Sequence, residues 1–451
     1  MESKPNNGAA QYGAWSEPLG NMPPRPLSLW LPQKTQLLAV LGSYLLARLY
    51  ISIWKQPDAL YTPLPLFFTA LFLLYGEALF RAREKAGAPA PASAQRRECL
   101  FWAILALGLP LAGWLGRCNA AEGWWLFFWH GFASYWVLCR AGLLVEGTTG
   151  YAFVFDAFWA AAMPVREFFL RLRTLVRALN GLRLNSRRSY AEKQQFALTL
   201  LCLLCAAPVL LGAVQLLSGA DSGFAQLVDG MRWELRLTFS ARLQEQLLYF
   251  ALSLPVGAWL YGLVGGAACR GSAACTGADM RAAGECVRFM PCAAAEIILG
   301  AFCLLYGLFF AVQANYLFGA FLGRLPAGFS AAQYARQGFF ELCGILTLNF
   351  ALLTACARLA AKPVRTRPLL RGLCVGLMAE CLLFCVTVAG KLGLYIVLFG
   401  FTPRRLLSFW AVLVFAAAAV LSAATLLRPQ KAISKLVWFA AASFAALCFL
   451  Y

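Results

Sequence analysis

The chain has 451 residues, of which 61% are apolar, 14% aromatic and 13% charged, and 39 Lys and Arg against 20 Asp and Glu give it a formal net charge of +19. Soluble domains are about 45–50% apolar and about 25% charged, and a soluble protein of this size could not bury so much apolar surface. Intrinsic disorder is also excluded, because it requires low hydrophobicity. The composition therefore indicates an all-α, polytopic integral membrane protein.

The expected elements begin after a polar, proline-rich N-terminal segment, residues 1–33, which has no apolar core of a cleavable signal peptide. Apolar runs of about 20 residues, the length that crosses a bilayer as a helix, then recur about eleven times. The expected spans are Gln36–Trp54, Leu60–Phe80, Cys99–Leu115, Trp124–Val145, Phe196–Leu217, Gln246–Gly266, Pro291–Phe318, Phe339–Ala360, Leu373–Leu398, Leu406–Leu427 and Leu436–Leu450.

The distribution of positive charge predicts how these spans are oriented. With the N-terminus inside, 27 Lys and Arg fall in inside segments, nine in outside segments and three within spans. Lys and Arg collect in the cytoplasmic loops of membrane proteins. We therefore expect the N-terminus inside and the C-terminus outside, with membrane lipids as partners. This explains the positive charge without nucleic acid, for which the sequence carries no binding signature.

Domain organisation follows from the spacing of the spans. A four-helix membrane region over 34–145 and a C-terminal membrane region of about seven helices over 196–451 are joined by residues 146–195. From Pro164 this connection is amphipathic, with an arginine face that includes Arg166, Arg173 and Arg177. We expect a helix in the cytoplasmic interface with this face toward anionic lipid. The alternative is that residues 164–183 bind a protein partner.

The sequence has no signature of catalysis or of a cofactor. His130 is the single histidine, which excludes sites that need two imidazoles, and we expect it to be hydrogen-bonded between helices or at the interface. Phosphate-binding and dinucleotide-binding loops are missing as well. The loop cysteines Cys269, Cys275, Cys286 and Cys292 are spaced too widely for a structural zinc site. We therefore expect no metal and no cofactor, and the sequence favours a protein that is not an enzyme.

Ionisable residues inside spans are costly in hydrocarbon and mark functional sites. They are Arg48, Glu77, Arg140, Glu296, Glu341, Glu380 and Lys391. Glu77 precedes Arg81 by one turn, which predicts a local ion pair. Glu341 and Lys391 lie near the outer ends of consecutive spans, so we expect them to approach each other, either as a structural ion pair or in a polar path for a substrate or proton. Glu380 lies deeper, without an obvious partner.

Two stretches carry recognisable motifs. The first, Tyr334 to Leu342, contains Y-x-R-x-G-F-x-x-L, and the second, Lys391 to Arg405, contains Y-x-x-x-x-G-x-T-x-x-R. Together they resemble the C-terminal half of a family of bacterial multi-pass membrane proteins known as a domain of unknown function (number 4173, related to number 4153). The resemblance covers about residues 290–430 and implies a bacterial cytoplasmic (inner) membrane protein, but it brings no established activity. Lys391 stands where that family has Arg, which keeps the charge but loses the bidentate geometry.

Both motifs fall at the outer ends of the eighth and ninth spans, where they would form one polar, basic surface that we name the outer-end patch. Its residues are Tyr334, Arg336, Glu341, Lys391, Tyr395, Thr402, Arg404 and Arg405. We expect a transporter-like or lipid-handling protein that receives an anionic group there. Three alternatives stay open: a patch that serves packing and binds lipid phosphates nonspecifically, a scaffold or sensor-associated subunit that works through a partner, and an intramembrane transferase on a lipid-linked substrate that uses Glu341.

Overall fold

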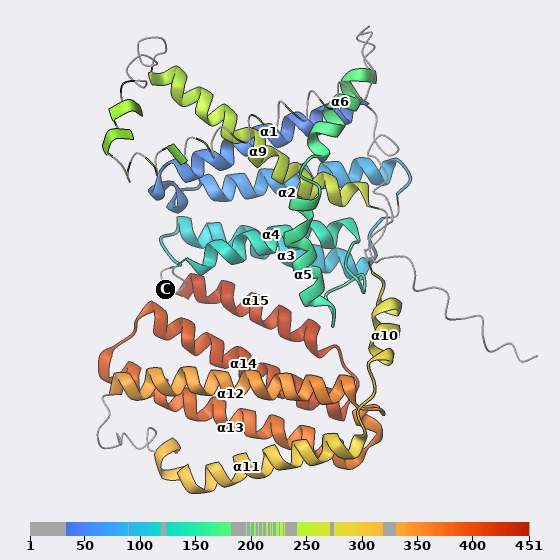
Figure 1. The fold of residues 1–451 in the computed structure, drawn as a ribbon, viewed down its shortest axis with the longest axis vertical. Coiled ribbons are helices and arrows are strands. Elements are labelled where there is room, and N and C mark those ends of the chain that lie inside the picture. Colours follow the sequence, from blue (N-terminus) through green and yellow to red (C-terminus); the bar gives the residue numbers. More distant parts are fainter. Residues whose placement is uncertain are drawn as a thin grey trace, which may run out of the picture.

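The computed structural model describes residues 33–88, 90–118, 123–181, 241–270, 275–318 and 331–450, with scattered helical positions between 195 and 230. These residues form helices joined by short turns, and no strand occurs among them (Figure 1). The helices are α1 Gln33–Lys55, α2 Leu64–Lys85, α3 Ser93–Trp114, α4 Trp124–Ala141, α5 Phe153–Arg166, α6 Leu170–Gly181, α9 Ala241–Cys269, α10 Gly277–Cys286, α11 Cys292–Phe318, α12 Ala331–Leu359, α13 Pro368–Phe399, α14 Pro403–Leu427 and α15 Ala432–Leu450.

Nine helices in the described ranges are long and apolar enough to cross a membrane, by length and composition. They are α1, α2, α3, α9 and α11 to α15, and each corresponds to an expected span. The expected fourth span forms α4, which ends at Ala141, where Gly142 adopts φ +75° and turns the chain. Its tryptophans, His130 and Arg140 lower its hydropathy, and it is not one of the nine. The expected fifth span, Phe196–Leu217, lies almost entirely outside the described residues.

Apolar side chains gather in two cores. The first bundle, α1 to α6 with α9 and α15, has a core rich in aromatic residues such as Trp102 and Trp129. The second bundle, α11 to α14, has a core of smaller side chains around Phe384 on α13. Helix α15 lies between α3 and α14 (Figure 1), and Phe101 stacks on Trp438 with ring centroids 4.9 Å apart. The last helix in the sequence therefore joins the first core.

Helices α5 and α6 run crosswise to the spans (Figure 1). Leu170 and Val176 are buried where α6 packs on α1 and α9, while Arg173 and Arg177 are exposed. The amphipathic pattern is thus real, but its apolar face contacts protein. Whether α6 also lies in the membrane interface stays a prediction.

Close packing on α9 positions this crosswise unit. Gly262 and Gly266 form a G-x-x-x-G pair, a pattern that lets helices approach closely. A Cβ at Gly262 would lie 2.9 Å from the Pro164 carbonyl oxygen, and one at Gly266 would lie 2.8 Å from Cγ of Glu167. Only glycine fits this contact without a shift of the neighbouring chain.

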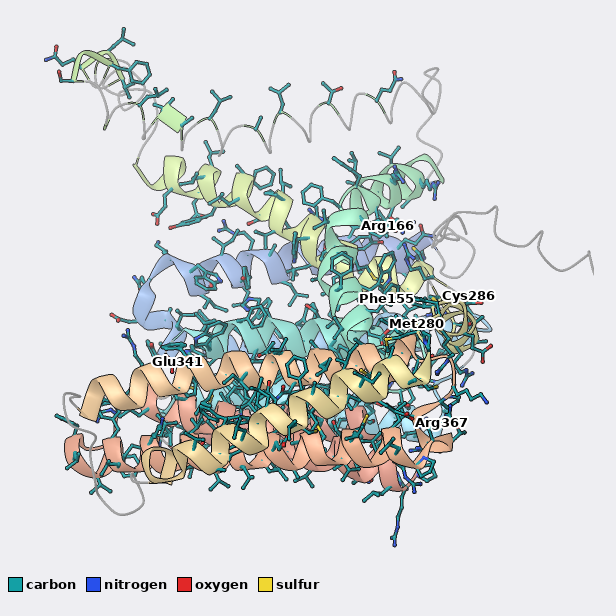
Figure 2. The ribbon with its side chains drawn as sticks, turned by 60° about the horizontal axis from the view of Figure 1, so that its bottom comes forward. Phe155, Arg166, Met280, Cys286, Glu341 and Arg367 are labelled. Atoms are coloured by element: carbon teal, nitrogen blue, oxygen red, sulfur yellow. The ribbon has the colours of Figure 1, made fainter. Side chains whose placement is uncertain are left out.

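Helix ends that the charge distribution assigns to one side also lie together. Lys55, at the end of α1, forms an ion pair with Glu245 near the start of α9, and both belong to the outside set. Cys286 and Arg367, of the inside set, lie at the opposite end of the molecule from Glu341 (Figure 2). The alternation of the described spans therefore agrees with the expected threading, and which end faces the cytoplasm stays a prediction.

Candidate functional site: a charged cleft between α2, α3 and α4

In the outer-end patch, the structure brings Glu341 and Lys391 near each other. Lys391 is 3% exposed and lies over Gly338, whose added Cβ would be 3.0 Å from both Cδ and Nζ of the lysine. Glu341, one turn further along α12, is exposed and interacts electrostatically with Lys391. The glycine therefore provides the space in which the buried ammonium approaches the carboxylate.

The second motif builds the turn between α13 and α14. Gly400 adopts φ +75°, and Thr402 is the N-cap residue of α14. Arg405 Nη1 donates to the carbonyl oxygens of Phe399 (2.9 Å) and Gly400 (2.5 Å), and its guanidinium lies 3.9 Å from the centroid of the Tyr395 ring. Tyr395, Thr402 and Arg405 are thus brought together by a helix C-terminus, where a cation is favoured.

The remaining expected site residues are more dispersed. Tyr334 and Arg336 belong to the first turns of α12, and their side chains lie outside the described part of the structure; Arg404 is exposed at the start of α14. Glu296, half-buried, lies near the start of α11. Glu380 lies beside Cys303, and its Oε2 is buried without a hydrogen-bond partner among the described residues.

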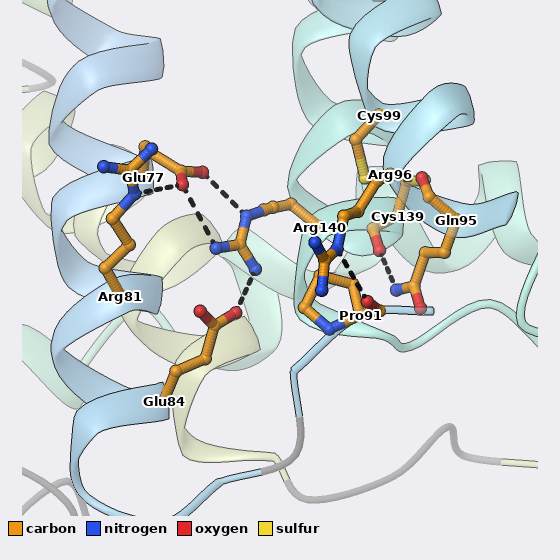
Figure 3. Close-up of polar contacts among 9 residues, drawn as sticks. All are labelled: Glu77, Arg81, Glu84, Pro91, Gln95, Arg96, Cys99, Cys139 and Arg140. Carbon is orange, nitrogen blue, oxygen red and sulfur yellow. Dashed lines mark hydrogen bonds and ion pairs between the residues drawn. The ribbon is translucent and has the colours of Figure 1, made fainter. Parts of the chain in front are cut away.

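A cluster of three ion pairs in the described part of the structure includes two residues that the sequence marks as intramembrane charges, Glu77 on α2 and Arg140 on α4. Arg140 Nε lies 2.7 Å from Glu77 Oε2, and Arg140 Nη1 lies 2.6 Å from Glu84 Oε1 (Figure 3). Arg81 completes the cluster with its Nε 2.6 Å from Glu77 Oε1, which confirms the expected local pair. Arg140 is 9% exposed, so two carboxylates hold a nearly buried guanidinium in place.

This cluster forms the polar end of a cleft of about 620 Å³ between α2, α3 and α4, which we name the charged cleft. Its charged lining residues are Glu77, Arg81, Glu84, Arg96 and Arg140. Its apolar lining includes Leu73, Leu74, Leu100, Ala103 and Trp136. The charges come from one end of the three helices and the apolar residues from positions further along them, so the cleft is amphipathic along its length.

Sequence reasoning missed Glu84 and Arg96. Glu84 lies seven residues after Glu77, so both carboxylates project from the same face of α2, and this spacing is readable in the sequence. No sequence pattern marks Arg96 as a site residue, because it lies in the first turn of α3, next to a loop. There its Nε donates to the Pro91 carbonyl at 3.0 Å. The pairing of α2 with α4, which completes the cluster, is not set by the order of spans along the chain.

A second cavity, of about 360 Å³, lies between α1, α2, α4 and α9 and is mostly apolar. His130 lines it, with Nε2 2.9 Å from Tyr50 Oη and Nδ1 2.7 Å from the Leu126 carbonyl. The expectation that His130 is hydrogen-bonded between helices is confirmed.

Two buried carboxylates hold the loop that joins α4 to α5. Glu98 Oε1 accepts from the Thr149 backbone N–H at 2.8 Å, and Asp156 Oδ1 accepts from the Val145 N–H at 3.1 Å. Asp156 Oδ2 is buried and has no hydrogen-bond partner among the described residues. Burial raises the pKa of Asp156 to about 7, an effect reduced by the Val145 hydrogen bond and increased by nearby Glu146 and Glu98. Asp156 is therefore a carboxyl group that takes up a proton near neutral pH.

Nine membrane-length helices in the described part of the chain, two helical cores and a charge cluster at one end of the helices define a membrane-embedded, all-α protein. The chain belongs to the family described as "Domain of unknown function (DUF4153)", whose model matches residues 100–451. The match extends well beyond the expected 290–430 and takes in α4 and most of α3. Comparison with curated proteins gives no match, and comparison with solved structures gives none either. The relation to the family numbered 4173 stays a prediction.

Proposed function

We propose that this chain is a lipid-handling, transporter-like protein of a bacterial inner membrane, and that the charged cleft receives a phosphate-bearing lipid. The observation that carries the proposal is the amphipathic lining of the cleft, with guanidinium and carboxylate groups at one end and apolar side chains along the rest. A phospholipid has the same division between headgroup and acyl chains.

The charges of the cleft favour a phosphate. Arginine binds phosphate through paired N–H donors, and three arginines line the cleft against two glutamates. Arg140 is nearly buried between the two glutamates, whereas Arg81 and Arg96 are exposed at the rim. Arg81 contacts Glu77 and Arg96 contacts the Pro91 carbonyl through Nε, so their terminal nitrogens are the headgroup contacts. With the N-terminus inside, this rim faces the cytoplasmic leaflet.

The cleft is a better lipid site than the outer-end patch. Arg405 donates to backbone carbonyls and stacks on Tyr395, and Lys391 is buried beside Glu341. These contacts support a packing role for the patch, which was one of the alternatives. We therefore place the substrate at the opposite end of the helices.

Lipid retention tests the proposal. The full-length chain and an Arg81→Gln/Arg96→Gln variant are purified in the same detergent, phosphatidylglycerol is added, and bound lipid is measured by native mass spectrometry. Loss of two charge-assisted contacts, each worth about 1.5–3 kcal/mol, should weaken binding at least tenfold. Arg97→Gln is the matched control, because Arg97 is exposed next to Arg96 and does not line the cleft.

The outcomes separate the candidate functions. Equal retention by all three proteins would contradict a lipid site in the cleft and favour a non-catalytic scaffold. Competition by inorganic phosphate at the same concentration would mean that the cleft recognises free phosphate and not a lipid. Equal loss of phosphatidylethanolamine would show that the phosphate, and not the net negative charge of the lipid, is recognised.

A further inference from the structure

Two cysteines that are far apart in the sequence meet at the outside end of the first bundle. Cys118 lies just after α3, Cys448 lies in the last turn of α15, and their exposed fractions are 3% and 0%. The backbone N–H of Cys118 donates to the carbonyl oxygen of Cys448 at 2.9 Å. The Cys118 thiol lies 3.8 Å from the Leu109 carbonyl oxygen and interacts directly with the Cys448 thiol.

The backbone geometry suits a covalent bond between them. A direct backbone hydrogen bond keeps the two residues close enough for their Cα atoms to fall near the roughly 4.4–6.8 Å seen in disulfides. Cys118 adopts φ +77°, a left-handed conformation that non-glycine residues rarely take. The contact with α15 therefore holds Cys118 in a backbone state that would otherwise be unfavourable.

A second thiol pair provides an internal comparison. Cys99 and Cys139 have sulfur atoms 3.1 Å apart and lie at the inside end of α3 and α4. Disulfides persist in oxidising compartments and are rare in the cytosol. Under the threading predicted from Lys and Arg, only the Cys118–Cys448 pair lies at the oxidising face.

We infer that Cys118 and Cys448 form a disulfide bond that ties α15 to the loop between α3 and α4. The two thiols lose two protons and two electrons as one S–S bond forms. The electrons pass to the disulfide of a thiol oxidase of the outer compartment, which is reduced to a dithiol. The inference rests on the predicted orientation in the membrane and is independent of the proposed lipid site.

Differential thiol labelling tests this inference on the full-length chain in bacterial membranes. Membranes are quenched in acid, denatured, and treated with N-ethylmaleimide; the protein is then reduced and labelled with deuterated N-ethylmaleimide before peptide mass spectrometry. We expect the deuterated label to predominate at Cys118 and Cys448, and the first label to predominate at Cys99 and Cys139. In Cys118→Ser, Cys448 should change to the first label.

Other labelling patterns would overturn the inference. The first label at Cys118 and Cys448 in the unsubstituted chain shows two free thiols, and this result does not depend on any variant that could fail to fold. The deuterated label at Cys99 and Cys139 alone shows that the opposite end of the helices faces the oxidising compartment. The lipid-retention experiment with the Arg81→Gln/Arg96→Gln variant tests only the charged cleft. Its outcome does not affect the thiol labelling of Cys118 and Cys448.

Discussion

The two bundles each place a cation inside a helical packing layer, and they stabilise it differently. In the first bundle, Arg140 is clamped by Glu77 and Glu84 from a neighbouring helix. In the second bundle, Lys391 lies over Gly338, with Glu341 one turn away. A planar guanidinium with several donors can bridge two carboxylates, whereas an ammonium on a flexible stem is a compact point charge.

The difference indicates in which bundle the charged residues line a binding space and in which they only fill a packed one. Arg140 depends on partners that also line a cleft, so its ion pairs shape a space that a ligand can enter. Lys391 fills a space between α12 and α13 and is 3% exposed. The first arrangement is suited to binding and the second to packing.

The largest expected effect breaks the first arrangement. Glu77→Gln/Glu84→Gln leaves the Arg140 guanidinium nearly buried without its carboxylates, and an unpaired buried charge costs about 3–5 kcal/mol. We expect a clear fall in the thermal unfolding midpoint in detergent, followed by tryptophan fluorescence. Arg81→Gln is the control, because this side chain is 70% exposed and its pair with Glu77 contributes less than about 1 kcal/mol. An equal fall in both proteins would contradict the clamp.

An effect of intermediate size concerns Asp156, a buried ionisable group that is stabilised in a third way. A proton neutralises its carboxylate, so no charged partner is needed. The pKa of Asp156 is about 7 in the folded protein and about 3.9 in an unfolded chain. The folded state therefore binds more protons between these values, and the free energy of unfolding falls as pH rises from about 4 to 7, by up to about 1.4 kcal/mol per unit.

Asp156→Asn should remove this part of the pH dependence, which unfolding measurements between pH 4.5 and 8 would show. Asp279 is a suitable control. It is an exposed residue in the first turn of α10, where it forms a capping box with the N-cap residue Thr276. The hydrogen bonds with Thr276 lower the pKa of Asp279, so its titration affects stability only below about pH 4. An unchanged slope in Asp156→Asn would assign the pH dependence to another group.

The smallest effect probes the second arrangement. Gly338→Ala places a Cβ about 3.0 Å from Cδ and Nζ of Lys391, and the end of this flexible side chain can move aside. We expect a loss of about 1 kcal/mol, measured by the same thermal assay. Gly344→Ala on the same helix meets no described atom within 4 Å and should be neutral or slightly stabilising. A loss as large as that of the double glutamine variant would show that Lys391 is as critical as Arg140.

Local features of the chain were predictable from the sequence. Apolar runs located the nine membrane-length helices, because run length alone decides whether a helix can cross a bilayer. The Glu77–Arg81 pair follows from helical spacing. The approach of Glu341 and Lys391 follows from the rule that consecutive helices pack together.

Contacts between non-consecutive helices were not predictable in this way. Arg140 meets Glu84 because α2 packs beside α4, and Cys118 meets Cys448 because α15 packs on α3. A single sequence does not predict either pairing, because an apolar helix face can pack against any other helix whose apolar face has a similar width. The charged cleft is therefore not predictable from the sequence, although the sequence marks Glu77, Arg81 and Arg140, three of its five charged residues.

The position of α15 has a consequence for how the molecule is assembled. Helix α3 is synthesised long before α15, and every span between them enters the membrane while the α15-binding face of α3, including Phe101, has no protein neighbour. Lipid must cover that face in the meantime and must be displaced when α15 arrives. The first bundle is therefore completed only after the second has been made, so the insertion order of the spans differs from the order in which their cores close.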